Sequence, residues 1–369
     1  MRKQILIAAI CSAMLLSACG SPELTKRVKP LGIEEKKGDE TFRDAQMQFT
    51  MSLLRQTVEY AADEEYLISP YLAAEAWLTA ANGNAGDENT DCFGGMPLSE
   101  LNRYFVKWRN TQNGLTEAQS LWISPADKNT ISKDVLRLYQ GLSGTSVFAA
   151  ERLSEGLNQW ISDATGGVVK EISAPQNSDA AMLGALTFDA IWSNTYGENE
   201  VRNVLFYDAN GGQLSVPFLC KDYDSAVYIE DDAVKGLRRN CSGQKYMFLA
   251  LMPKSGSPAE LLGNLSAEQL TSYIRSGIDT TLRTGIPVLE ADLTQDIAAL
   301  MPDVGIDQIV QRVSVNIGRG TTDSIFSLQM DDSSAKPAEH IMFDHPFVYF
   351  VIDRQYGLPL IAGTVNQVS

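Results

Sequence analysis

The sequence contains few of the residues that enzyme and metal sites use most often. Only two of its 369 residues are histidine, His340 and His345, and five are cysteine. No HExxH, GxSxG, GxGxxG or Walker motif occurs, and no two cysteines have the spacing of metal ligands. These absences argue against the common metal, hydrolase and nucleotide-binding sites. We therefore expect no cofactor and no enzymatic activity.

Positive charge is also scarce. The chain has 30 Lys and Arg residues against 46 Asp and Glu residues, a net charge of −16. Nucleic acid would be repelled, and no basic stripe with interleaved aromatic residues offsets this charge. No internal repeat or second linker divides the chain, so we expect one large domain that does not bind nucleic acid.

The longest apolar run near the N-terminus is short. Residues 5–16 follow Arg2 and Lys3, and this run is too short to cross a bilayer. It ends in Leu-Ser-Ala-Cys19, which resembles a bacterial lipobox, in which the cysteine thiol receives a diacylglycerol. The pattern predicts a signal peptide over residues 1–18 and a lipid anchor at Cys19. The protein would then be held on a bacterial membrane outside the cytoplasm, at the cell surface or in the periplasm.

Residues 19–40 are charged and interrupted by Pro and Gly, so we expect a flexible tether there and a folded domain over residues 41–369. Beyond Cys19 the chain keeps Cys92, Cys220 and Cys241. Export permits a disulfide, and Cys220 with Cys241 is the favoured pair because both lie in a strand-rich region. Three buried free cysteines remain an equal alternative.

The last 27 residues, 343–369, show the strongest structural pattern. Residues 347–352 are apolar on both faces, residues 353–357 form a polar turn that ends in glycine, and residues 358–363 are apolar again. This pattern predicts a hairpin buried on both faces at the centre of the core.

Helical and strand patterns are intermixed upstream without regular alternation, which predicts an α+β fold. Helices are expected at 48–60, 71–81, 132–142, 153–172 and 258–277, with a short one beginning at 296. Strands are expected at 115–123, 184–193 and 247–252. Ser69 and Pro70 would begin the second helix as its N-cap and first residue.

Seven segments in order resemble the serpin family of protease inhibitors. They include Ile68-Ser69-Pro70, Asn158-x-Trp160-Ile161 with Thr165, the strand 186–192, Val216-Pro217-Phe218, the strand 248–254, Asp296-Ile297 with 304–306, and the C-terminal hairpin. The resemblance implies three β-sheets, about eight or nine helices and an exposed reactive-centre loop. It implies a monomer whose partner is a serine or cysteine protease. The alternative is a non-inhibitory binding or scaffold protein with a shortened loop.

Inhibition in this family requires that the cleaved loop insert into the main sheet as a new strand, and two alignments of that loop are open. In the first, Gly320 and Thr321 form the hinge, and 22 residues, 321–342, precede Phe343. Inhibitors carry alanines where this chain reads Thr-Asp-Ser-Ile-Phe, and placing Asp323 on a buried face would cost several kcal/mol.

In the second alignment, residues 324–330 are the fifth strand of the main sheet, and the loop shrinks to the ten residues 333–342. At about 33 Å that loop would be too short to insert. We favour this alignment because it keeps a long fifth strand. The reactive loop is then predicted to contain Ser333, Ser334, Ala335, Lys336 and Pro337, with Lys336 as the bait. By resemblance, a central shutter cluster would contain Ser69, Asp189 and Ser324, without the family's histidine.

A hydrolase of the penicillin-binding type is a weaker alternative. Residues 333–336 and 242–245 both fit the SxxK pattern, and Arg283-Thr284-Gly285 imitates a later box of that class. Neither SxxK lies early in the chain at a helix start, and no Ser-x-Asn follows in the required place.

Overall fold

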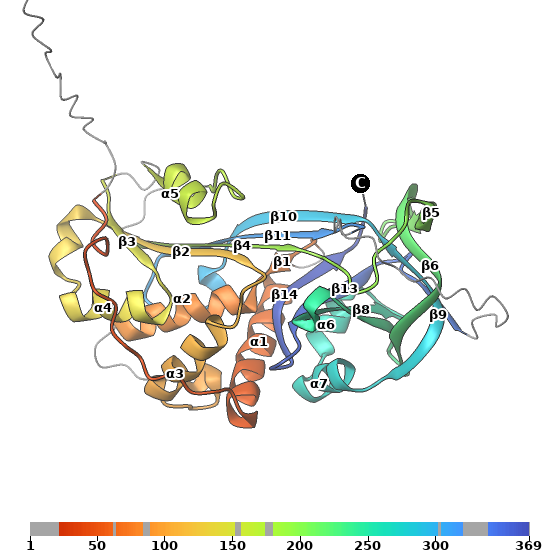
Figure 1. The fold of residues 1–369 in the computed structure, drawn as a ribbon, viewed down its shortest axis with the longest axis horizontal. Coiled ribbons are helices and arrows are strands. Elements are labelled where there is room, and N and C mark those ends of the chain that lie inside the picture. Colours follow the sequence, from red (N-terminus) through yellow and green to blue (C-terminus); the bar gives the residue numbers. More distant parts are fainter. Residues whose placement is uncertain are drawn as a thin grey trace, which may run out of the picture.

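In the computed structural model of the protein, a five-stranded sheet lies between one short helix and a group of longer helices (Figure 1). The structure describes residues 22–61, 64–83, 89–151, 156–173, 180–301, 304–319 and 339–368. The strand order in this sheet is β10-β11-β4-β2-β3. The strands are β2 (Thr116–Ile123), β3 (Ser146–Ala149), β4 (Ala180–Asp189), β10 (Leu289–Asp296) and β11 (Gln308–Ile317).

A nine-stranded sheet forms the rest of the β-structure in the described residues, in the order β1-β14-β13-β8-β7-β6-β9-β12, with β5 paired to β6. Its strands are β1 (Leu67–Ile68), β5 (Val201–Tyr207), β6 (Gln213–Glu230), β7 (Val234–Asn240), β8 (Tyr246–Pro253), β9 (Ile278–Pro287), β12 (Glu339–Met342), β13 (Phe347–Asp353) and β14 (Leu358–Val365). Three sheets were expected. Two are observed because β6 is continuous: it pairs with β5 at one end and with β7 at the other.

The described residues contain seven α-helices, which together with the sheets confirm the predicted α+β class. They are α1 (Glu40–Ala61), α2 (Pro70–Gly83), α3 (Leu98–Arg109), α4 (Lys133–Leu142), α5 (Leu157–Ala164), α6 (Pro258–Asn264) and α7 (Ala267–Arg275). Five short 3-10 helices are η1 (Asp91–Phe93), η2 (Pro125–Asn129), η3 (Glu198–Glu200), η4 (Ser242–Gln244) and η5 (Ala298–Leu300). None of the described helices is long and apolar enough to span a bilayer.

Local signals explain where the predicted helices differ from the observed ones. The region expected as one helix, 258–277, is two, because Ser257 and Ser266 each cap a separate helix with a reciprocal capping box. The helix expected over 153–172 is described only as α5, which ends before Gly166 and Gly167. These glycines have φ angles of +61° and +84°, which a helix cannot contain.

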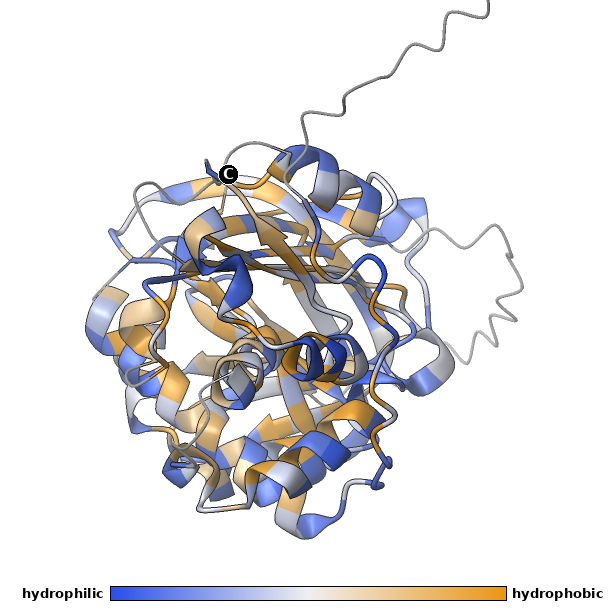
Figure 2. Cartoon of the chain, turned by 90° about the vertical axis from the view of Figure 1, so that its left-hand side faces the viewer, coloured by the Kyte–Doolittle hydropathy of each residue, from blue (hydrophilic) through white to orange (hydrophobic). Residues whose placement is uncertain are grey.

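The C-terminal hairpin is confirmed. Strands β13 and β14 are buried along their whole lengths, β13 pairs with β8, and β14 pairs with β1. Hydrophobic residues concentrate on the strands and on the inward faces of the helices, while the outer helix faces are hydrophilic (Figure 2). The chain's end therefore forms the centre of the core, as its apolar pattern predicted.

Residues 22–39, expected to be part of a flexible tether, instead lie along the domain. The amide of Leu24 donates to the carbonyl of Val147 in β3 (2.7 Å), and that of Leu31 donates to Arg137 in α4 (2.8 Å). Three apolar side chains of the segment pack against the core: Leu24, Val28 and Ile33. The charge-rich composition concealed these contacts, because its apolar residues are few and widely spaced. We call residues 22–39 the N-terminal strap.

Candidate functional site: the central seam of the five-stranded sheet

The middle strand of the five-stranded sheet, β4, is parallel to its neighbour β11. Their pairing, here called the central seam, runs from Gln308 opposite Ala181 to Asn316 opposite Asp189. A segment that leaves the end of β11 and folds back is antiparallel to β11, and therefore antiparallel to β4 as well. At the seam, a returning segment can therefore form antiparallel pairs with both of its neighbours.

The position of β11 corrects the favoured loop alignment. The fifth strand, between β4 and β10, is Gln308–Ile317, so residues 324–330 are not that strand. The chain then has 21 residues, 318–338, between β11 and β12. Alternation of Phe326, Leu328 and Met330 favoured a strand there, but these residues lie outside the described part of the chain. The register of the sheet assigns the fifth position to β11.

The end of β11 is held by an aromatic and cationic cluster. The indole Nε1 of buried Trp192 donates to the carbonyl of Gly318 (2.8 Å), directly after β11. The guanidinium of Arg239 lies 5.2 Å from the ring centre of Trp192 and 4.4 Å from that of Tyr196. Arg319 donates from Nε to the carbonyl of Tyr196 (3.4 Å). The point from which the loop leaves the sheet is therefore fastened to the segment that follows β4.

The middle of the seam is fixed by Gln311, a residue that the sequence did not single out. Its side-chain Oε1 accepts from the amide of Ser69 (3.1 Å), and its Nε2 donates to the carbonyl of Ser69 (3.1 Å). The Ser69 hydroxyl donates to the carbonyl of Leu360 (2.8 Å) and accepts from the amide of Leu72 (3.0 Å). Both side chains are buried. Ser69 therefore joins α2, β11 and β14.

The predicted shutter cluster is corrected accordingly. Ser69 lies at the centre of the seam, but Asp189 is exposed at the end of β4, opposite Asn316. Gln311 stands opposite Gly184, five residues from Asp189 and about 17 Å away along the strand. The structure therefore does not bring Ser69 and Asp189 together. The sequence signal that could have located the centre of the seam was Gln311, a buried glutamine in the fifth strand, β11.

Several predicted residues lie outside the described residues. They are Cys19, the hinge pair Gly320 and Thr321, Ser324, and the loop residues Ser333, Ser334, Ala335, Lys336 and Pro337. Their roles remain predictions.

Helix α5 and the segment after it cover the outer face of the seam. Ile161 of α5 belongs to a buried cluster with Leu183 of β4 and Val310 of β11, and Ile172 joins the same cluster. Arg312 of β11 donates to the carbonyl of Glu171 and forms an ion pair with Asp292 (2.8 Å). A strand that enters the seam must therefore displace the segment that contains Glu171 and Ile172.

A buried charge cluster lies on the other side of the sheet. The Nε of Arg109 lies 3.2 Å from a carboxylate oxygen of Glu75 in α2 and 3.2 Å from one of Glu117 in β2. The pKa of Glu75 is raised well above its usual value, first by burial and then by the nearby Glu117. The same burial raises the pKa of Glu117. Two carboxylates share one guanidinium, so the cluster favours the protonated form of one of them.

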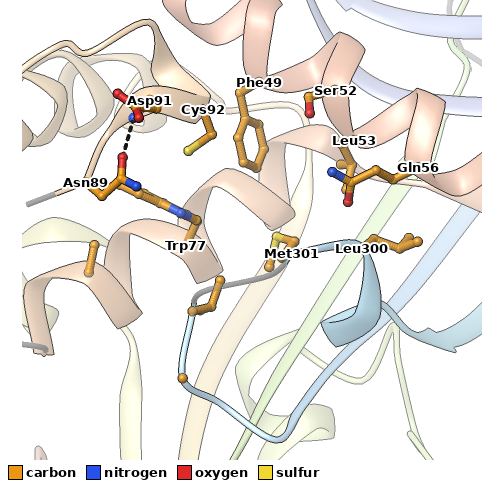
Figure 3. Close-up of a pocket in the computed structure, with 13 residues that line it drawn as sticks. Phe49, Ser52, Leu53, Gln56, Trp77, Asn89, Asp91, Cys92, Leu300 and Met301 are labelled. Carbon is orange, nitrogen blue, oxygen red and sulfur yellow. Dashed lines mark hydrogen bonds between the residues drawn. The ribbon is translucent and has the colours of Figure 1, made fainter. Parts of the chain in front are cut away.

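The cavities and cysteines do not assemble an obvious reaction centre in the described parts of the chain. A cavity of about 430 Å³ lies between α1, α2, η1 and η5 (Figure 3), lined by Phe49, Trp77, Cys92 and Met301 among others. Burial raises the pKa of Cys92 to about 12, so its thiol is not an activated nucleophile. Cys220 and Cys241 are buried and free, so the favoured disulfide is wrong.

The hydrolase alternative loses one of its two motifs. Lys245, the lysine of the SxxK at 242–245, places its Nζ 3.2 Å from Oδ2 of fully buried Asp353, and this ion pair opposes a role as a general base. The SxxK at 333–336 lies outside the described residues. No group of three or more His, Cys, Asp or Glu side chains that could hold a metal occurs in the described residues.

Residues 44–368 match the family model for serpin, serine protease inhibitor. The chain belongs to the serpin family. Among solved structures, the native state of tengpin, a thermophilic serpin, has a TM-score of 0.82 at 21% identity, covering 95% of this chain and 100% of that one. The latent state of tengpin has a TM-score of 0.73 at 20% identity, covering 91% and 100%.

The names of the curated relatives indicate different functions. An uncharacterised serpin-like protein of Thermococcus kodakarensis is 21% identical over 56% of this serpin and 54% of its own length. A probable non-inhibitory serpin of Arabidopsis thaliana is 24% identical over 70% and 63%. Plasminogen activator inhibitor 1 of Sus scrofa is 21% identical over 86% and 90%. The matches thus span less than two thirds of the length of the first two relatives.

Proposed function

We propose that this serpin is a lipid-anchored inhibitor of serine or cysteine proteases that inserts its cleaved loop into the central seam. The observation that carries the proposal is the parallel pairing of β4 with β11, followed by 21 residues before β12. Fully extended, 21 residues reach about 70 Å, whereas the ten residues of β11 span about 33 Å. The segment is therefore long enough to cross the sheet and to leave residues for a protease to bind.

The alternation in this segment suits an inserted strand. Phe326, Leu328 and Met330 share one side, and Asp323 falls on the other. With the apolar side toward the core, the carboxylate of Asp323 would face solvent, so the cost of burying it does not arise. Insertion would replace the single pairing of β4 with β11 by two pairings, one between the inserted strand and each of these neighbours. The additional backbone hydrogen bonds would favour the inserted form once the loop is cut.

Lys336 is the proposed bait residue, which would make trypsin-like enzymes the first targets to test. Incubation with trypsin-, subtilisin- and papain-like proteases is expected to give a covalent complex that survives SDS. Thr322→Arg, on the side predicted to face the core, should convert the inhibitor into a substrate. Ile325→Arg, on the opposite side, is the matched control and should retain inhibition. Cleavage of the wild type with full retained protease activity would refute inhibition.

Attachment to a bacterial membrane outside the cytoplasm is the second part of the proposal. It rests on the Leu-Ser-Ala-Cys19 pattern after a short apolar run. Labelled palmitate should appear in the wild-type protein and sediment with membranes, whereas Cys19→Ser should be unlabelled. A wild-type protein without label would refute the anchor and leave the inhibitor proposal intact.

A non-inhibitory binding protein is the second candidate. The hinge sequence Thr-Asp-Ser-Ile-Phe, in place of small residues, favours it. Clean loop cleavage without a complex, by all three classes of protease, would support it.

A further inference from the structure

The N-terminal strap fixes where an anchor at Cys19 would attach to the domain. The carbonyl of Pro22 accepts from the amide of Ala149 (3.2 Å), the last residue of β3, and Leu24 pairs with Val147. The strap therefore begins at the C-terminal end of β3. Cys19 precedes Pro22 by three residues, which reach at most about 11 Å. A tether of 20 flexible residues would let the domain take any orientation relative to the membrane, whereas a tether of three residues restricts that orientation.

The attachment point and the start of the loop lie at opposite ends of the five-stranded sheet. Ala149 is level with Ile123 of β2, which pairs with Ala180 at the start of β4. Loop residue Gly318 follows the end of β11, which is level with Asp189 at the end of β4. Asp189 lies nine residue steps beyond Ala180, about 30 Å along the strand. Figure 1 shows β3 and β5 at opposite ends of the long axis.

Exposed cations gather where the strap begins. Lys26 and Arg27 occupy the centre of a turn closed by the Val28 amide and the Thr25 carbonyl (2.9 Å), and both side chains are exposed. Lys128 is exposed in η2, which follows β2 at the same end of the sheet and contacts β3. Residues 22–30 of the strap carry three cations, Lys26, Arg27 and Lys29, against the single anion Glu23, in a chain whose net charge is −16; in η2, Asp127 lies beside Lys128. Each cation beside an anionic bilayer strengthens association about fivefold.

We propose that this serpin stands on an anionic phospholipid membrane on the end formed by η2, the end of β3 and the strap turn, with Gly318 directed to the medium. This orientation rests on the lipidation of Cys19 proposed above. With the strands along the membrane normal, the point from which the loop leaves would lie about 30 Å farther from the membrane than the attachment point. Proteases arriving from the medium would meet the loop end first, and the membrane would not obstruct the seam.

Energy transfer from the lipidated full-length protein to vesicles tests the orientation. A fluorophore would be coupled to Asn129→Cys in η2 or to Asn203→Cys in β5, both exposed positions, in a Cys92→Ser background. Cys220 and Cys241 are buried, so they should label poorly. The vesicles contain phosphatidylethanolamine, phosphatidylglycerol and a headgroup-labelled acceptor lipid. We expect transfer from position 129 to be several times that from position 203.

Charge reversal tests the lipid contact. Lys26→Glu with Arg27→Glu should lower transfer from position 129 on these vesicles and leave it unchanged on phosphatidylcholine. Exposed Arg275→Glu in α7 is the matched control and should change neither. Equal transfer from both positions in a lipidated protein would overturn the orientation, and insensitivity to the double reversal would overturn the anionic contact. A Cys19→Ser protein that binds vesicles as fully as the wild type would instead refute the anchor.

Discussion

The two hydrogen bonds between Gln311 and Ser69 predict a large effect of one substitution. Gln311→Ala would leave the amide of Ser69 without its partner at 3.1 Å, and the carbonyl of Ser69 would keep only the amide of Ala73 (3.0 Å) as a donor. An unpaired buried amide costs about 1–3 kcal/mol and the second lost hydrogen bond about 0.5–1.5 kcal/mol, so we expect a loss of about 2–4 kcal/mol in the free energy of unfolding. The loss should lower Tm by several degrees in a domain of this size.

Gln295→Ala is the matched control, because it removes the same residue type from the neighbouring strand β10. Gln295 makes one described side-chain hydrogen bond, from Nε2 to the carbonyl of Leu67 (2.8 Å), so we expect a loss of about 1 kcal/mol. Both variants would be unfolded in urea and followed by circular dichroism. Equal midpoints for Gln311→Ala and the wild type would show that the pair does not hold the seam.

Three further predictions concern the seam and its surroundings. Trp192→Phe keeps a ring but loses the donor to Gly318, so uncut protein should convert to a loop-inserted form several times faster, measured as loss of inhibition over time. An unchanged rate would contradict this role. Arg312→Ala frees the segment at Glu171 from β11 and should also speed conversion, whereas Arg202→Ala, which removes an exposed pair with Asp222, should not. Burial raises the pKa of the Glu75 carboxyl above its ordinary value of 4.5. The protonated carboxyl therefore contributes its full stability below pH 4.5, and this contribution is lost as the pH rises through the pKa of Glu75 in the folded protein. Glu75→Gln should therefore gain stability relative to the wild type as pH rises from about 4.5 to 8, and a constant difference across that range would exclude the shift.

The C-terminal hairpin and the start of α2 could be predicted from sequence because their signals are local. An apolar run on both faces and a Ser-Pro pair each specify one structure without reference to distant residues. The family resemblance extended that prediction to the whole fold. Gln311 could not be found in this way, because a polar residue within an apolar strand has meaning only once its partner, 242 residues away, is known.

The strap and the loop show where pattern alone misleads. Residues 22–39 have the composition of a linker, yet their amides pair with β3 and α4, a fact of tertiary structure. Alternation at 324–330 led us to place the fifth strand there, but β11 occupies that position, and residues 324–330 lie outside the described part of the chain. That correction lengthens the loop and reverses the main argument against insertion.

The most direct measurement of the central claim is the thermal stability of the protein before and after a single cut near Lys336. If the freed segment enters the seam between β4 and β11, it replaces one ladder with two, and Tm should rise strongly. An unchanged Tm in protein that has been fully cut would show that the seam does not open, and that this serpin does not inhibit by insertion.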